Sequence, residues 1–499
     1  MSLKFNILAG MVSSAWSALL GILVVPLFLR YIGVEAYGLV GVYGTITTML
    51  VVFDLGLVAT LNREVARASS TGSISMVGPL LHSLAVIYWS VGLCLGAVIF
   101  LLAPWLATHW LNPAGLSHDT VARAIRLMAL VVISRWPLGL YQAAMIGAQR
   151  IIPLSMVNIV MATVGNLGAV GIMAFLSPRI EAYFIWQAAV AFSWTLALRL
   201  GAWRYIGCTV VGGFSWPAVR TVAKFSLGMT GVSLLGMALS QMDRAILSRL
   251  LSLDAFGAYV IAATVSGTLY VLTTPVFNGL NPRLTALVRQ ADMLQVEATY
   301  RTTSRGLASF IFPVAMLLVV YAHDFLLLWT GKPDLAGRAA PLVSLLVAGT
   351  ALHCCTFMPY ALQLAHGALR LTLSILVILI VCAFPVMLVL VQKYGAIGAA
   401  YSWLLLHCFY IVIGSLVTHR WLMRSALMSW LCSDIGVPLA ISIAFGLLGR
   451  MDARNSGGTW RHLFVGGGLT VVAALLSIIT SPRLRETLYR TIQPKTVPC

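Results

Sequence analysis

The feature that most constrains this chain is a series of apolar runs, each long enough to cross a membrane. A helix needs about 20 predominantly apolar residues to span a hydrocarbon core of about 30 Å. We count fourteen such runs in a chain that is 60% hydrophobic and only 9% charged. The pattern predicts an all-α polytopic membrane protein and excludes an ordinary soluble domain. We expect spans near residues 5–29, 37–61, 81–107, 124–147, 152–176, 182–203, 223–247, 257–280, 306–329, 341–365, 371–391, 396–418, 431–449 and 462–480.

The Lys and Arg residues of the loops predict how the spans are oriented. The first span begins almost at Met1 without a cleavage site after it, so we expect no cleavable signal peptide. With the N-terminus inside, the inner loops hold about twice as many Lys and Arg residues as the outer loops. Both termini are therefore expected in the cytoplasm. Much of the net charge of +18 then reflects topology and attraction to the inner leaflet, and no nucleic-acid partner is expected.

A short motif occurs twice, which indicates an internal duplication. Glu35-Ala-Tyr-Gly38 and Asp254-Ala-Phe-Gly257 each lie between two apolar runs. Further echoes pair Leu61-Asn62 with Leu280-Asn281, and Gly147-Ala-Gln-Arg150 with Gly367-Ala-Leu-Arg370. An even number of spans separates the copies, so both halves enter the membrane in the same sense, and such repeats usually place a substrate site between them. We expect two pseudo-symmetric six-helix lobes, an extra helical pair and a basic tail, at residues 1–205, 220–422, 431–480 and 481–499.

Polar residues form stripes along some of the spans. In the seventh span, one helical face carries Ser226, Thr230, Ser233, Ser240 and Arg244. In the fourth span, Arg135 and Gln142 share a face. One interpretation is that hydroxyls bond back to their own helix and small residues let helices pack. The other is that these stripes line a wetted cavity, which we favour where a stripe contains an arginine, because a lipid-facing Arg is costly.

Charges within spans have two open interpretations. Asp54 lies two-thirds of the way along the second span, and Asp243-Arg244 lies near one end of the seventh. Such residues either pair as salt bridges between helices or serve transport. In the second case the arginines face an anionic substrate headgroup, since the planar guanidinium suits phosphate. Asp54 is then a counter-ion or a carboxylate that binds Na⁺ or a proton.

Several chemistries find no support in the sequence. There is no G-x-x-x-x-G-K-[ST] phosphate loop, and the nine His residues lack metal-binding spacings. His353, His366 and His407 are expected to be hydrogen-bonded within the bundle. The eight Cys residues form no disulfide framework or zinc motif. We therefore expect no enzyme and no cofactor, apart from H⁺ or Na⁺ as a coupling ion.

Several motifs resemble bacterial polysaccharide flippases of the Wzx type, over most of the first 422 residues. They include Asn6-Ile-Leu-Ala-Gly10, Pro26-Leu-Phe-Leu-Arg30, Phe53-Asp54-Leu-Gly56, Asn62-Arg63, Met242-Asp243-Arg244 and Tyr394-Gly-Ala-Ile-Gly398. That family belongs to the multidrug/oligosaccharidyl-lipid/polysaccharide (MOP) superfamily, whose fold is two six-helix lobes in a V. The resemblance implies alternating-access transfer of an undecaprenyl-diphosphate-linked oligosaccharide across the bacterial inner membrane, for O-antigen, capsule or exopolysaccharide.

The resemblance also implies roles for particular residues. We expect Arg63, Arg135, Arg244 and Arg283 to contact the diphosphate or sugar, and Asp54 or Asp243 to serve as counter-ion or coupling group. The extra pair at 431–480 departs from the commonest twelve-span pattern and is similar to that of lipid II flippases, so we expect it to hold the prenyl tail in a groove. The implied partners are the bilayer, a polysaccharide polymerase and a chain-length regulator.

Three other functions stay open at this stage. A multidrug or cation antiporter of the same superfamily would share the two lobes, but should have a more acidic and aromatic cavity. A lipid II flippase would move a chemically related precursor. A membrane polymerase usually has a large outer loop and no duplication, and this sequence shows the opposite in both respects.

Overall fold

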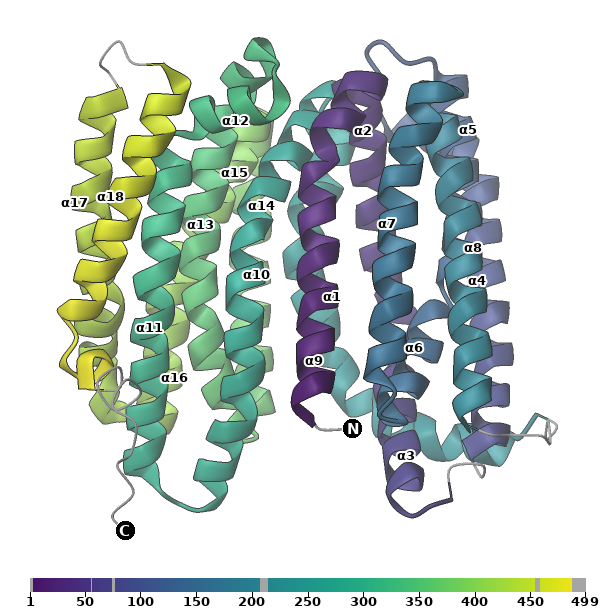
Figure 1. The fold of residues 1–499 in the computed structure, drawn as a ribbon, viewed down its shortest axis with the longest axis horizontal. Helices are drawn as coiled ribbons and strands as arrows, with labels where there is room; N and C mark the ends of the chain where they lie inside the picture. The colour runs from purple at the N-terminus through teal and green to yellow at the C-terminus, as the bar shows by residue number, and fades with distance from the viewer. Residues whose placement is uncertain (1–2, 55, 74–76, 207–213, 454–457, 487–499) are drawn as a thin grey trace. The chain divides into compact units, whose positions relative to one another are not determined.

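The computed structural model describes residues 3–54, 56–73, 77–206, 214–453 and 458–486, although not the side chains of residues 221–230 and a few others. Every regular element in these ranges is helical. The chain divides into two compact units, Met1–Gly257 and Ala258–Cys499. Figure 1 labels the helices of each unit.

The first unit contains nine α-helices and the start of a tenth. They are α1 (Leu3–Leu23), α2 (Val25–Leu50), α3 (Leu57–Ser70), α4 (Gly78–Trp105), α5 (His118–Arg135), α6 (Leu138–Gly147), α7 (Ile151–Phe175), α8 (Ile180–Ile206), α9 (Trp216–Leu250) and α10 (Leu253–Arg289). Its apolar core lies among α3, α4, α6 and α8, around residues such as Leu61, Leu84 and Tyr141. Helix α9, which the duplication assigns to the second lobe, makes its contacts with α2, α3 and α4. The contacts therefore place α9 in the first unit, whereas the sequence repeat assigns it to the second lobe.

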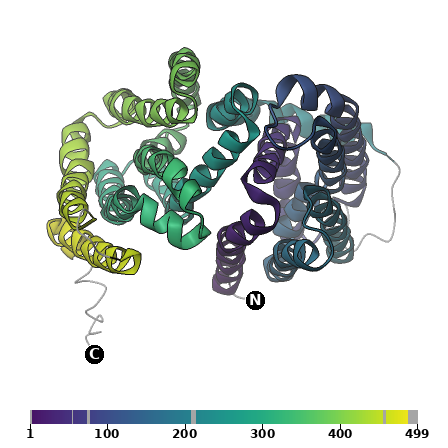
Figure 2. The same ribbon diagram turned by 90° about the horizontal axis from the view of Figure 1, so that it is seen from above.

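The second unit continues from α10. It contains α11 (Met293–Val320), α12 (Ala322–Thr330), α13 (Pro333–Ala365), α14 (Leu369–Tyr394), α15 (Ala396–Phe409), α16 (Ser415–Leu422), α17 (Val437–Ala453) and α18 (Thr459–Ile479). Helix α13 is its most buried span and packs against α11, α12 and α15. Figure 2 shows α17 and α18 side by side, and both also contact α11.

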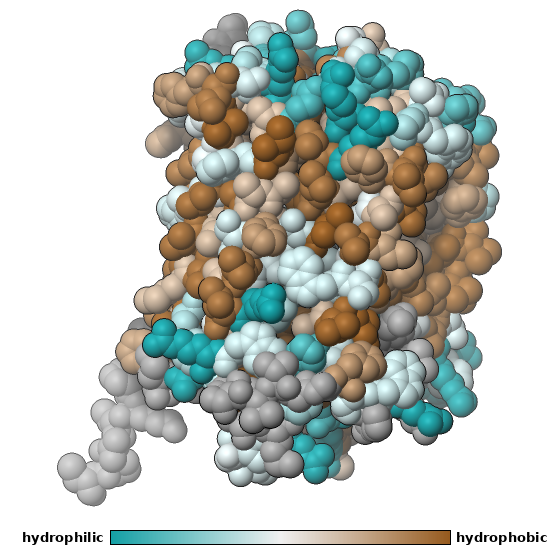
Figure 3. Space-filling model, turned by 90° about the vertical axis from the view of Figure 1, so that its right-hand side faces the viewer, coloured by the Kyte–Doolittle hydropathy of each residue, from teal (hydrophilic) through white to brown (hydrophobic). Residues whose placement is uncertain are grey.

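The helices confirm a polytopic membrane protein. Within the described residues, eleven helical segments are long and apolar enough to cross a membrane, and α1, α8 and α9 cover the remaining three expected spans. The face drawn in Figure 3 carries mostly hydrophobic residues across its middle, with hydrophilic residues gathered toward its ends. This distribution fits a surface whose middle lies against lipid tails.

The second span differs from the prediction of 37–61. It runs over Val25–Asp54, with a kink at Gly33, and a separate helix, α3, follows. The backbone breaks because Gly56 adopts a left-handed conformation with φ of 74°, which a helix cannot continue through. Asp54 therefore lies at the end of the span, and the expectation that it lies two-thirds of the way along was wrong.

The duplicated motif packs against its own copy within the first unit. A Cβ atom at Gly38 in α2 would lie 2.6 Å from the carbonyl oxygen of Leu253. A Cβ atom at Gly257 in α10 would likewise meet the carbonyl oxygen of Val34. Each copy thus supplies one glycine and one carbonyl to a reciprocal contact. The glycines are required because the two backbones touch.

The second echo of the duplication has a different register from the one expected. The turn between α6 and α7 contains Gln149 with φ of 58°, and the turn between α13 and α14 contains Gly367 with φ of 65°. These two left-handed residues occupy the same place in their turns, so Gln149 corresponds to Gly367. Aligning Gly147 with Gly367 by sequence letters was wrong, because backbone conformation and not residue type defines the turn.

Candidate functional site

A broken helix places Arg135 near the middle of a membrane span. The span His118–Gly147 consists of α5, which ends at Arg135, and α6, which begins at Leu138. The helix breaks at Pro137 because proline cannot donate a backbone hydrogen bond. The Thr195 hydroxyl donates to the Ser134 carbonyl oxygen over 2.7 Å, which satisfies a polar group at the break. Broken helices of this kind are tolerated where neighbours or water satisfy the backbone.

Arg135 is an exposed cation held on an indole ring. Its guanidinium carbon lies 5.6 Å from the ring centre of Trp194 in α8. Across the part of the chain that the structure describes, no carboxylate forms an ion pair with it. A cation–π contact leaves the guanidinium donors available for another anion. This arrangement can bind a phosphate or carboxylate group.

A row of polar side chains continues from Trp194. The Trp194 indole donates to Asn158 Oδ1 over 3.0 Å, and Gln142 Nε2 lies 3.5 Å from the same oxygen. The structure thus brings together Arg135 and Gln142, two residues that the sequence placed on one helical face. Reasoning from sequence missed Asn158 and Trp194. Asn158 was detectable as a strong hydrogen-bonding group within an otherwise apolar run.

Asp54 is the second predicted charge for which the structure defines a partner. The Tyr88 hydroxyl of α4 donates to Asp54 Oδ1. The Tyr88 ring stacks on Trp136, with ring centres 6.1 Å apart, and Trp136 follows Arg135 in the chain. Tyr88 and Trp136 therefore form an aromatic cluster. Asp54 is hydrogen-bonded to one of its rings, and Arg135 is the chain neighbour of the other. Sequence analysis did not identify Tyr88 as a partner.

The hydrogen bond between Tyr88 and Asp54 gives a direct test of this cluster. We expect Tyr88→Phe to lower the free energy of unfolding by about 1–3 kcal/mol, because it leaves a partly buried carboxylate short of a donor. Thermal unfolding in detergent measures the change. Tyr401→Phe is the control, since the exposed Tyr401 hydroxyl has no hydrogen-bond partner among the described residues. If Tyr88→Phe were as stable as Tyr401→Phe, this hydrogen bond would not stabilise the folded protein.

The other predicted charges lie on α3, α9 and α10. Arg63 in α3 is exposed and pairs with Glu64 over 2.8 Å. Arg283 is exposed on α10, in the second unit. In α9, Asp243 is buried with only 5% of its surface exposed, and Arg244 is half-buried. Within the first unit, Arg63, Arg135 and Arg244 lie on three different helices, α3, α5 and α9.

The hydroxyl stripe of the seventh span is visible at one position. The Ser240 hydroxyl donates to the Met237 carbonyl oxygen over 3.0 Å, so it bonds back to its own helix. Ser226, Thr230 and Ser233 belong to α9, but their side chains lie outside the described residues. The Ser240 hydroxyl therefore has a hydrogen-bond acceptor in its own helix, and no ligand is needed to explain its position.

Histidines of the second unit are hydrogen-bonded within the bundle, as expected. His353 Nδ1 lies 2.7 Å from the Tyr270 hydroxyl, and His407 Nδ1 lies 2.8 Å from the Trp403 carbonyl oxygen. His366 Nδ1 lies 3.0 Å from the Leu362 carbonyl oxygen. Counted back from the left-handed turns, His353 holds the position in its helix that Arg135 holds in the first unit. Across the described residues, no three His, Cys, Asp or Glu side chains cluster closely enough to hold a metal ion.

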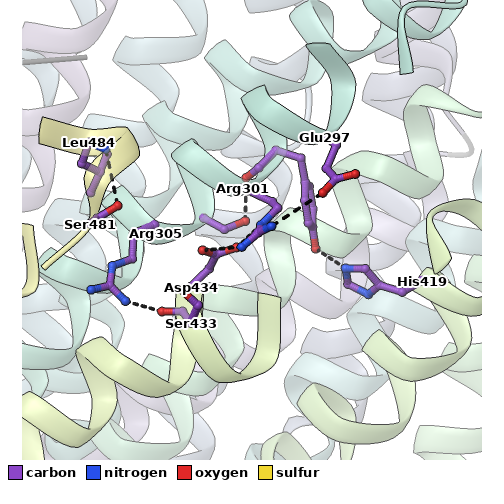
Figure 4. Close-up of polar contacts among 10 residues, drawn as sticks. Glu297, Arg301, Arg305, His419, Ser433, Asp434, Ser481 and Leu484 are labelled. Atoms are coloured by element: carbon purple, nitrogen blue, oxygen red, sulfur yellow. Dashed lines mark hydrogen bonds and ion pairs between the residues drawn. The ribbon is translucent and has the colours of Figure 1, made fainter. Parts of the chain in front are cut away.

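A second polar cluster joins α11 to the C-terminal pair (Figure 4). The Arg301 Nε donates to Asp434 Oδ2 over 2.7 Å, and a second nitrogen lies 3.6 Å from Glu297. Arg305, one turn further on, donates to the Ser433 carbonyl oxygen, to the Ser477 carbonyl oxygen over 2.9 Å and to Thr480 Oγ1 over 2.8 Å. These bonds involve both segments of the pair. Arg301 and Arg305 therefore bind protein groups and hold α17 and α18 to α11.

The rest of the interface between the pair and α11 is closely packed. Cβ atoms at Gly446 and Gly466 would collide with Met316 and Leu317. The remaining cavity has about 20 Å³, enough for roughly one water molecule. Near the other end, His462 Nδ1 lies 3.1 Å from Asp324 Oδ2, and the Tyr321 hydroxyl donates to the Gly449 carbonyl oxygen. A prenyl chain has no room within this interface, so a groove for the tail would require another face of the pair.

The fold is similar to the folds of two solved membrane transporters. The chain is similar to a lipid II flippase MurJ in an inward closed conformation, with a TM-score of 0.68, 10% identity and coverage of 97% of this chain and 99% of that one. It is also similar to an inward-facing multidrug resistance MATE family transporter of the MOP superfamily, with a TM-score of 0.67, 12% identity and coverage of 84% and 99%. At these identities the likeness concerns the fold alone.

Sequence comparison then gives the family. The profile of the family described as "Polysaccharide biosynthesis protein" matches residues 3–288, more than half of the chain. The chain belongs to this family. A relative from Shigella flexneri, described as "Putative O-antigen transporter", is 21% identical over 379 residues, which cover 75% of this chain and 87% of that protein.

Proposed function

We propose that this protein is a flippase for undecaprenyl-diphosphate-linked oligosaccharide repeat units in the bacterial inner membrane. It moves the units from the inner to the outer leaflet by alternating access, for O-antigen, capsule or exopolysaccharide synthesis. Membership of the polysaccharide biosynthesis family and a fold shared with flippases and drug transporters support this proposal. Both termini face the cytoplasm, in keeping with the distribution of Lys and Arg.

The observation that carries the proposal is the environment of Arg135. A lipid-facing arginine near the middle of a span costs about 2.5–3.5 kcal/mol or more, so an exposed one is expected to face water or a ligand. The indole of Trp194 holds its cation, and no ion pair with a described carboxylate neutralises it. A diphosphate supplies the missing negative charge. Trp194, Asn158 and Gln142 beside it offer an aromatic ring and amide groups of the kind that contact sugars.

The other assignments complete the proposal. Arg63, Arg244 and Arg283 meet the diphosphate or sugar at other stages of the transport cycle, and Asp54 or Asp243 provides the coupling site for H⁺ or Na⁺. A polymerase and a chain-length regulator act on the delivered units. The lobes 1–205 and 220–422 are the moving parts.

Substitution of Arg135 tests the proposal. We expect Arg135→Ala to lower export of repeat units by about tenfold or more, because a hydrogen bond to a charged group contributes about 1.5–3 kcal/mol. Arg135→Lys should retain part of the activity, since it keeps the charge but loses the planar fork. The measurement is the amount and sidedness of lipid-linked oligosaccharide in a deletion strain that carries each variant.

Arg123→Ala is the matched control. Arg123 lies on the same helix, but its guanidinium already pairs with Asp119 and Glu181. Full export by Arg135→Ala would remove Arg135 from the site. Normal sidedness in the deletion strain, with new sensitivity to cationic drugs, would contradict the flippase and favour an antiporter. Repeat units that reach the outer leaflet but stay unpolymerised would instead indicate a polymerase.

A further inference from the structure

The end of α16 forms an open groove that the transport cluster does not involve. The groove has a volume of about 730 Å³ and is lined by Arg420, Trp421 and Arg424 together with Leu416, Val417 and Leu422. It lies where the span Ala396–Leu422 ends and the chain turns through Met423 toward the C-terminal pair. Its size falls within the range of about 300–1,000 Å³ that is typical of ligand pockets.

Two arginines give the groove its charge. Arg420 and Arg424 are four residues apart and both exposed. The Arg424 Nε donates to the Arg420 carbonyl oxygen over 2.9 Å, which holds this side chain while its terminal nitrogens stay available. Elsewhere, Arg301, Arg123 and Arg461 pair with carboxylates. For Arg420 and Arg424, the described residues provide no such partner.

The apolar part of the groove has the character of a membrane interface. Trp421 is 77% exposed and Leu416 is 40% exposed, and both lie at the end of a membrane-spanning segment. Tryptophan gathers at the level of lipid headgroups, where its ring meets the acyl chains and its N–H meets water. A ligand that fits has an anionic head for the arginines and an apolar chain for Trp421 and Leu416.

We propose that this groove binds the phosphate of an anionic phospholipid from the leaflet at this end of α16. Arg420 and Arg424 bind the phosphodiester through their planar guanidinium groups. The acyl chains lie against Trp421 and Leu416. A resident lipid at this position fills the groove at the junction between α16 and the C-terminal pair.

Quenching of Trp421 fluorescence by brominated lipid tests this proposal. The full chain is reconstituted into vesicles with dibrominated phosphatidylglycerol, or with dibrominated phosphatidylcholine at equal bromine content. The difference between the native chain and Trp421→Phe isolates the Trp421 signal. We expect a preference for phosphatidylglycerol of at least about tenfold, because each arginine near a charged lipid surface contributes about fivefold in affinity. Arg420→Gln with Arg424→Gln should abolish the preference.

The matched control is Trp460, which is 72% exposed and precedes Arg461. Arg461 already pairs with Asp452 over 3.1 Å, so quenching of Trp460 should show no lipid preference. Unchanged quenching of the double variant by phosphatidylcholine shows that it is folded. Equal quenching of native Trp421 by both lipids would overturn the proposal. So would relief of phosphatidylglycerol quenching by trace undecaprenyl diphosphate, which would assign the groove to the transported lipid.

Discussion

Gly38→Ala is expected to disrupt the packing of the first unit. The added Cβ would lie 2.6 Å from the Leu253 carbonyl oxygen, and neither backbone can move without displacing α2 or α10. Overpacking typically costs about 1–3 kcal/mol, and this backbone contact places the cost at about 3 kcal/mol or above. Gly257→Ala should have a similar effect, since it meets the Val34 carbonyl oxygen. Thermal unfolding in detergent and the yield of monodisperse protein measure both.

Gly44→Ala provides the control on the same helix. A Cβ at Gly44 would have no neighbour within 4 Å, and alanine favours helix. We therefore expect Gly44→Ala to be neutral or to stabilise by up to about 1 kcal/mol. If Gly38→Ala were as stable as Gly44→Ala, the reciprocal glycine contact would not exist in the folded protein.

Asp434→Ala has the second large expected effect. It leaves the Arg301 side chain, only 11% exposed, without its carboxylate partner at 2.7 Å. Removing one member of a buried ion pair costs about 3–5 kcal/mol. Glu297 lies 3.6 Å from Arg301 and compensates in part, so we expect the lower end of that range. Thermal unfolding should show the loss, and limited proteolysis should show release of α17 and α18 from α11.

A double-mutant cycle separates this ion pair from general damage. Arg301→Ala with Asp434→Ala should be less destabilised than the sum of the single variants. The exposed pair Arg461–Asp452, with side chains 55% and 17% exposed, is the control, and its coupling should stay at or below about 1 kcal/mol. A coupling energy near zero for Arg301 and Asp434 would show that they do not join the pair to α11.

The interpretation of charges within spans illustrates the limit of prediction from sequence. Arg135 and Gln142 were predicted to share a face, and they belong to one polar row. The sequence left two interpretations open for charges within spans, and the structure shows the surroundings of some of these charges. Asp54 accepts a hydrogen bond from Tyr88, whereas Arg135 rests on Trp194 without a described carboxylate partner. The partners of such charges are residues distant in the chain, and helical periodicity carries no information about them.

The sequence by itself determined the class of protein, the helical spans and the presence of a repeat, because apolar length and motif spacing are local properties of the chain. Only the tertiary structure decided that the two copies of the motif meet at Gly38 and Gly257, that Gly56 ends the second span at Asp54, and that Trp194 holds Arg135. These features arise from a backbone conformation or from contacts between residues far apart in sequence. Packing selects such contacts, and no periodicity along one helix specifies its partner on another.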